Sequence, residues 1–176
     1  MTWIIGYGSL IWRPAFESVE AVPGLLRGWK RRFWQGSPDH RGTPVAPGRV
    51  VTVLRGAPAD TIGIVAYRLP PNQEESIRAQ LDHREQAGYV LESVSVDLDD
   101  GRTCVGELYT AGPGNPSWLG PAPLVDMAKQ IAESTGPSGP NLDYLIRLDD
   151  ALAQLGRVDS HVRELREAAE SLHSRG

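Results

Sequence analysis

Strand-like segments fill the first two thirds of the chain and helix-like segments dominate the last third, and this order constrains the fold class most. Short runs rich in β-branched and aromatic residues predict strands at residues 3–7, 29–34, 49–54 and 61–69. Apolar and polar residues alternate over residues 90–98, and an Asp-Asp-Gly sequence at 99–101 leads into a strand-like run at 103–110. We therefore expect a β-hairpin over residues 90–110.

Helical periodicity predicts four helices, at residues 72–87, 124–134, 141–155 and in a terminal segment around 162–172. Asn72 and Asn141 have the residue type expected of N-terminal caps, and Gly88 is placed to end the first helix. Strands collected early and helices late favour an α+β fold over an alternating α/β fold. The length of 176 residues predicts a single domain over residues 1–176.

Composition and charge limit which kinds of partner and compartment we expect for this protein. The net charge of −4 argues against general affinity for nucleic acid or anionic membranes. The longest apolar runs, such as residues 50–54 and 62–67, are too short to span a bilayer. Cys104 is the one cysteine, which excludes an internal disulfide and suits a reducing compartment. We expect a cytoplasmic protein that binds neither nucleic acid nor a membrane.

A glycine-rich segment follows the first predicted strand. It consists of Gly6, Tyr7, Gly8, Ser9, Leu10 and Ile11, called here the glycine loop. Its two glycines would let backbone N–H groups approach a ligand closely, although a plain strand-exit turn has the same pattern. A dinucleotide-binding fingerprint would need a third glycine at position 11, a P-loop would need Gly-Lys-Ser/Thr, and Ser9 lies outside a Gly-x-Ser-x-Gly nucleophile elbow. These three motifs are excluded, whereas the ligand loop and the turn both stay open.

Glu85 is the acidic residue with the most informative position. Ile77, Leu81 and Glu85 are spaced i, i+4, i+8, so the carboxylate follows the apolar stripe of the first predicted helix. Apolar surroundings and the C-terminal end of the helix dipole would both raise its pKa and suit it to general-base catalysis. The alternative is a surface carboxylate paired with His83 or Arg84.

Other candidates have structural explanations of equal or greater weight. Residues 27–34 interleave basic and aromatic side chains, which invites a nucleic-acid interpretation, but a strand would divide them between two faces. In an acidic chain this favours local structural use, or recognition of a small acidic ligand. Tyr144 is open between core packing and a phenol aimed at a site, and Cys104 has the position of a small core residue. The four histidines show no ligand spacing, so we expect no metal site and no cofactor.

Seven segments carry a resemblance to a known family. They are Gly-Tyr-Gly-Ser-Leu-Ile-Trp at 6–12, Arg-Arg-Phe-Trp-Gln-Gly-Ser at 31–37, His-Arg-Gly at 40–42, Pro-Gly-Arg-Val-Val-Thr at 47–52, Leu-Asp-His-Arg-Glu at 81–85, Leu-Gly-Pro-Ala-Pro at 119–123, and residues 136–145. Together and in this order they resemble the ChaC family of glutathione-specific γ-glutamylcyclotransferases. The resemblance extends from the N-terminal strand to about residue 150, and the number of ordered motifs makes it specific.

The resemblance implies a fold, an activity and a set of site residues. It implies an α+β fold, the small mixed β-barrel of the γ-glutamylcyclotransferases with flanking helices. The glycine loop (Gly6, Tyr7, Gly8, Ser9, Leu10 and Ile11) would hold the γ-glutamyl group, Glu85 would be the proton acceptor, and Tyr144 would lie near the substrate. Some family members carry extra residues before the position of Tyr89, which leaves the role of Tyr89 open.

The reaction implied by the resemblance is an intramolecular cyclisation. The γ-glutamyl group of glutathione closes into 5-oxoproline and Cys-Gly is released, without a cofactor, a metal or a covalent enzyme intermediate. Two alternatives stay open at this point. The protein could act on other γ-glutamyl dipeptides or γ-glutamylamines, or it could be a catalytically silent binding module.

Overall fold

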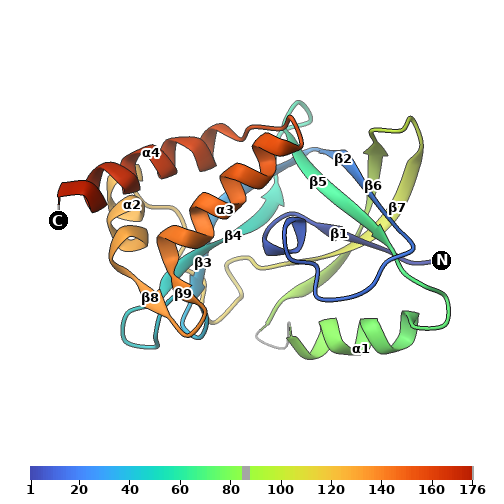
Figure 1. Ribbon diagram of the computed structural model, residues 1–176, viewed down its shortest axis with the longest axis horizontal. Helices are drawn as coiled ribbons and strands as arrows, with labels where there is room; N and C mark the ends of the chain where they lie inside the picture. Colours follow the sequence, from blue (N-terminus) through green and yellow to red (C-terminus); the bar gives the residue numbers. More distant parts are fainter. Residues whose placement is uncertain (85–87, 176) are drawn as a thin grey trace. The chain divides into compact units, whose positions relative to one another are not determined.

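The computed structural model (Figure 1) describes residues 1–84 and 88–175. These residues divide into two compact units. The first, called here the barrel unit, comprises Met1–Lys30 and Val53–Pro116. The second, the helical unit, comprises Arg31–Thr52 and Ser117–Gly176. No helix among the described residues is long and apolar enough to cross a membrane.

The barrel unit is built on five strands in the order β1-β5-β2-β6-β7. Their bounds are β1 Trp3–Gly6, β2 Glu20–Arg27, β5 Thr61–Arg68, β6 Val90–Leu98 and β7 Thr103–Thr110. Neighbouring strands are antiparallel except β1 and β7, whose parallel pairing closes the barrel. The predicted hairpin is confirmed: β6 and β7 pair over their length, and Gly101 in the turn has a φ of +89°, which glycine adopts readily.

Alternate residues of the strands fill the barrel with apolar side chains. This core consists of Ile5, Leu26, Trp29, Val53, Ile62, Ile64, Ala66, Val94, Val96, Leu98 and Leu108. Cys104 packs against it as a half-buried residue, as predicted. Helix α1, Glu74–Arg84, lies outside the strands (Figure 1), where Ile77 and Leu81 pack with Ile4 and Leu69.

Strand β2 has no counterpart among the predicted strands, because its sequence contains Pro23 and Gly24. Proline removes a ladder donor and glycine weakens a strand, so both argue against a central strand from sequence alone. In the barrel, Gly24 lies where β6 comes closest: a Cβ there would be 2.7 Å from the carbonyl oxygen of Asp97. Glycine therefore permits this strand pairing, which a larger residue would block.

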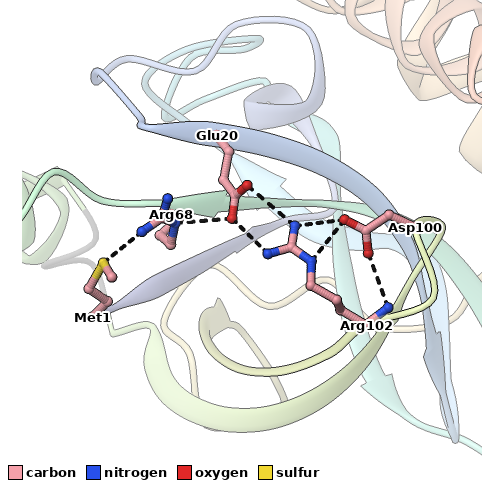
Figure 2. A network of polar contacts seen from close by, with 5 residues as sticks. All are labelled: Met1, Glu20, Arg68, Asp100 and Arg102. Carbon is pink, nitrogen blue, oxygen red and sulfur yellow. Dashed lines mark hydrogen bonds and ion pairs between the residues drawn. The ribbon is translucent and has the colours of Figure 1, made fainter.

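A polar network ties together strand ends of the barrel unit (Figure 2). The Arg102 guanidinium lies between the carboxylates of Glu20 and Asp100, at 3.0 and 2.6 Å, and Arg68 pairs with Glu20 at 3.0 Å. Hydrogen bonds from Arg102 lower the pKa of both carboxyl groups. Met1 completes the network, with its sulfur 2.8 Å from a nitrogen of Arg68. The network joins the start of β2, the end of β5 and the β6–β7 turn.

The helical unit contains α2 (Leu124–Glu133), α3 (Asn141–Gln154) and α4 (Ser160–Arg175), with the short strands β8 (Thr135–Gly136) and β9 (Gly139–Pro140) between α2 and α3. Helices α2 and α3 both pack against α4. Strands β3, Trp29–Ser37, and β4, Gly48–Arg55, form a two-stranded sheet and contribute residues to both units. All helices predicted from periodicity are present, although the predicted end of the first helix, at residue 87, lies outside the described residues.

Neither of the two predicted N-terminal caps is confirmed. Helix α3 begins at Asn141 itself, after Pro140, and no side chain caps its first turn. The buried Asn141 side chain instead accepts a hydrogen bond from the N–H of Arg49 and donates one to the carbonyl of Arg49, each at 2.8 Å. The Asn141 side chain thus bonds the backbone of strand β4, whereas the capping rule expects it to bond the first turn of its own helix. Helix α1 likewise begins two residues after Asn72, at Glu74.

Candidate functional site

The glycine loop leaves the barrel at the end of β1 and turns at once into the short 3₁₀-helix η1, Ser9–Ile11. The N–H of Ile11 donates to the carbonyl of Gly8 at 2.9 Å, and the N–H of Arg13 donates to that of Ser9 at 2.8 Å. Within residues 1–84 and 88–175, the N–H groups of Gly8, Ser9 and Leu10 donate to no acceptor. Three neighbouring backbone donors are therefore available to an oxygen of a ligand.

Tyr67 of β5 holds this loop in place. Its buried hydroxyl donates to the carbonyl of Leu10, and Phe16 packs edge-on against its ring with centroids 5.6 Å apart. Burial raises the pKa of Tyr67 to about 12, so the phenol stays a donor. The loop folds so closely over β1 that a Cβ on Gly6 would lie 3.0 Å from the Cβ of Leu10 and 3.2 Å from the Tyr67 ring. A side chain at the first glycine would therefore require its neighbours to shift by a few tenths of an ångström.

Two contacts connect the loop with its surroundings in the barrel unit. The hydroxyl of Tyr7 donates to the carbonyl of Tyr109 at 2.5 Å. A terminal nitrogen of Arg84, the last described residue of α1, lies 3.5 Å from the hydroxyl oxygen of Ser9. The end of α1 thus lies beside the glycine loop. Glu85 follows Arg84 in the chain but lies outside the described residues, so its predicted role as a base stays a prediction.

The prediction for the helix stripe that precedes Glu85 is confirmed. Ile77 and Leu81 are only 4% and 3% exposed and pack against the barrel strands. Sequence reasoning did not single out Tyr67 or Tyr109. Their signal was slight: each is an aromatic residue with a polar tip within a strand, and its partners lie far away in the sequence.

Tyr144 lies on α3 of the helical unit, where it is 7% exposed. Its hydroxyl accepts the N–H of Val51 at 3.3 Å, the Phe33 ring meets it edge-on at 5.9 Å, and the Arg41 guanidinium lies 5.7 Å from its ring centre. These contacts give Tyr144 a place in the packing of this unit. Its role near the substrate stays a prediction.

The basic and aromatic residues at 27–34 are divided between two faces, as a strand requires. Trp29, Arg31 and Phe33 of β3 are buried, and the residues between them are half-buried. Arg31 pairs with Asp159 at 2.8 Å from within the helical unit, with its side chain fully buried. The arrangement supports local structural use of this segment.

His161 is also part of the packing of the helical unit. Its Nε2 accepts the backbone N–H of Phe33 at 3.0 Å, which requires a neutral imidazole. Burial, together with the positive charge of Arg32, lowers its pKa to about 4. Among the described residues, no group of three or more His, Cys, Asp or Glu side chains is arranged to hold a metal ion.

A closed barrel in one unit and a group of packed helices in the other define the class of the fold. A crystal structure of a γ-glutamylcyclotransferase specific to glutathione from yeast matches this chain with a TM-score of 0.92 and 31% sequence identity. The match covers 99% of this chain and 98% of the yeast chain. The expected γ-glutamylcyclotransferase-like α+β fold is confirmed.

Sequence comparison then identifies the family. The ChaC-like protein family matches residues 2–172, and the chain belongs to it. A γ-glutamylcyclotransferase 2-3 of Arabidopsis thaliana is 43% identical over 93% of this chain and 85% of its own length. The glutathione-specific γ-glutamylcyclotransferase 1 of Homo sapiens is 41% identical over 94% of this chain and 77% of its own length.

Proposed function

We propose that this protein degrades glutathione as a γ-glutamylcyclotransferase, releasing 5-oxoproline and Cys-Gly. Membership of the ChaC-like family, over nearly the whole chain, is the observation that carries the proposal. Relatives named as glutathione-specific enzymes support glutathione as the substrate in preference to other γ-glutamyl compounds. The same names favour an enzyme over a silent binding module.

The chemistry needs a base and a folded-back substrate. The α-amine of the γ-glutamyl group attacks its own side-chain amide carbonyl and forms a five-membered ring. An α-amine has a reference pKa of about 8, so it is largely protonated near neutral pH and must lose a proton first. Since the attack is intramolecular, holding the reactive conformer supplies much of the acceleration.

Glu85 is the proposed base. It follows the end of α1, which packs on the barrel through Ile77 and Leu81 and approaches the glycine loop through Arg84. A carboxylate accepts the ammonium proton and can return it to the leaving amine of Cys-Gly. In this scheme the enzyme contributes proton transfer and positioning, with no cofactor, metal or covalent intermediate.

The glycine loop is the proposed binding element for the γ-glutamyl group. The N–H groups of Gly8, Ser9 and Leu10 point to an oxygen-rich ligand, either the substrate carboxylate or the oxyanion that develops at the amide carbon. Tyr67 and the close packing at Gly6 keep these donors in place before substrate arrives. Tyr144 completes the proposed set of substrate-binding residues.

We place the protein in the cytoplasm, where glutathione is kept reduced. The one cysteine, Cys104, is half-buried, and burial raises the pKa of its thiol, which makes the thiol less reactive. One cysteine cannot form an internal disulfide, so the fold does not depend on an oxidising compartment.

A direct assay tests the proposed activity. Purified protein is incubated with glutathione, and 5-oxoproline and Cys-Gly are followed by mass spectrometry, with and without EDTA. We expect both products to appear in equal amounts and EDTA to have no effect. Absence of both products at high enzyme concentration would refute the proposed function.

A further inference from the structure

A row of polar contacts runs beside the apolar stripe of α1. Glu74, Arg78 and Asp82 are spaced i, i+4, i+8, so they share one face of the helix. Each contacts a partner from the β1 and β7 side of the barrel. The contacts join Glu74 to the hydroxyl of Thr2, Arg78 to Glu107 at 3.0 Å, and Asp82 to the hydroxyl of Tyr109 at 2.5 Å.

The two stripes together fix how α1 lies on the barrel. Ile77 and Leu81 hold the helix against Ile4 and Leu69, which determines its distance from the strands. Apolar contacts are not directional, so they allow the helix to slide and rotate. Hydrogen bonds and ion pairs at three successive turns remove that freedom. Glu107 and Tyr109 alternate with buried residues of β7, so both face outward from the barrel toward α1.

Tyr109 differs from the other two partners because it also contacts the glycine loop. Its hydroxyl donates to Asp82, while its backbone carbonyl accepts the hydroxyl of Tyr7. Burial and the neighbouring Asp82 raise the pKa of the Tyr109 phenol, so it stays a donor at the pH of any assay. Its ring packs with the Ile4 and Leu81 cluster. One residue thus contacts both the end of α1 and the proposed substrate loop.

We infer that Tyr109 is a positioning residue that sets the end of α1 relative to the glycine loop through its hydrogen bond to Asp82. The inference rests on the proposed function, in which Glu85 follows α1 as the base and the loop holds the γ-glutamyl group. Asp82 lies in the last turn of α1 and precedes Glu85 by three residues in the chain, so a change at this contact alters the position of the helix end that the proposed base follows. Turnover then falls more than substrate binding, because the bound amine and its base are no longer aligned.

A double-mutant cycle tests the inference. Tyr109→Phe keeps the ring and the backbone carbonyl and removes the donor; Asp82→Ala removes the acceptor at an exposed position. Each change should lower kcat for glutathione by about ten- to a hundredfold with KM changed less than about twofold. The double variant should be no slower than either single variant, since all three lack the same hydrogen bond.

Thr2→Val is the matched control. It also removes a hydroxyl that donates to a carboxylate of α1, but at the other end of the helix, so kcat should stay within about twofold of wild type. Losses in kcat that multiply in the double variant, wild-type turnover in Tyr109→Phe, or an equal loss in Thr2→Val would each overturn the positioning role. Glu85→Gln, assayed in parallel, separates this role from the base: an active Glu85→Gln enzyme refutes the base, whereas multiplying losses refute the positioning of Tyr109.

Discussion

Tyr67 supports the glycine loop through one hydroxyl group. Removing this hydroxyl therefore tests whether a single side chain holds the loop in place. Tyr67→Phe keeps the buried ring and its contact with Phe16 but leaves the carbonyl of Leu10 without this donor. We expect the free energy of unfolding to fall by about 1–2 kcal/mol. A looser loop should also raise KM for glutathione several-fold. Urea denaturation and steady-state kinetics measure both, and wild-type values in both would contradict the anchoring role.

His161 predicts a pH dependence of stability. Folding lowers its pKa from 6.5 to about 4. Between pH 6.5 and pH 4, His161 is therefore protonated in the unfolded chain and neutral in the folded chain. Stability is therefore complete above about pH 6.5 and is lost as the pH falls toward 4, by about 3 kcal/mol when protonation is complete.

His161→Gln is the control for this effect. Glutamine can still accept the N–H of Phe33 but does not titrate. Urea midpoints measured from pH 7.5 to 4.5 should fall less steeply for His161→Gln than for wild type. Parallel curves for the two proteins would show that His161 does not contribute to the acid sensitivity.

For single residues, the sequence predicted which side chains are buried better than it predicted their hydrogen-bond partners. The spacing of Ile77 and Leu81 identified the buried stripe of α1 correctly, because that periodicity is local. The partners of Tyr67 and Tyr109 lie 57 and 27 residues away, so no local pattern could indicate them. Asn141 is a further example: its sequence position predicted a helix cap, but its side chain bonds the backbone of Arg49 in a distant strand.

At the scale of elements, α3 and α4 are joined by a buried charge. The side chain of Asp149 is 1% exposed and pairs with Arg163 at 2.9 Å and Arg166 at 3.0 Å. Its neighbour Asp150 pairs with the same Arg166 at 2.6 Å, but its side chain is 57% exposed. The two aspartates therefore offer a matched comparison between a buried and an exposed ion pair.

Asp149→Asn should lower the free energy of unfolding by about 2–4 kcal/mol, because two arginines lose their buried counter-charge. Asp150→Asn should cost less than about 1 kcal/mol, since water screens an exposed pair. Chemical denaturation of both variants and wild type under one set of conditions decides the comparison. Equal losses in the two variants would mean that the α3–α4 contact does not depend on the buried charge.

Helices and strands with a regular apolar pattern were predicted well, whereas a strand that contains proline and glycine was missed. The β6–β7 hairpin has apolar and polar residues alternating over residues 93–98 and an Asp-Asp-Gly turn, and the bounds of both strands match the prediction. Strand β2 escaped prediction because Pro23 and Gly24 argue against a strand, and only the close approach of β6 explains the glycine. The prediction of one domain over residues 1–176 stays a prediction.

For the whole molecule, substrate choice is the broadest test. The stretches at residues 36–48 and 112–123 are rich in proline and glycine, and we expect them to recognise the Cys-Gly tail. The value of kcat/KM should then be higher for glutathione than for γ-glutamyl-alanine and γ-glutamyl-ε-lysine. Equal values for the three substrates would show that the enzyme reads only the γ-glutamyl group.

Glu85→Gln tests the central claim most directly. Glutamine keeps the size and hydrogen-bonding capacity of the side chain but cannot accept the ammonium proton. We expect a folded variant that still binds glutathione, with a melting temperature equal to or slightly above wild type, and kcat lower by about two to four decades. Turnover and melting are measured on the same preparation, so that loss of the base is distinguished from loss of the fold. A fully active Glu85→Gln enzyme would contradict the assignment of Glu85 as the base.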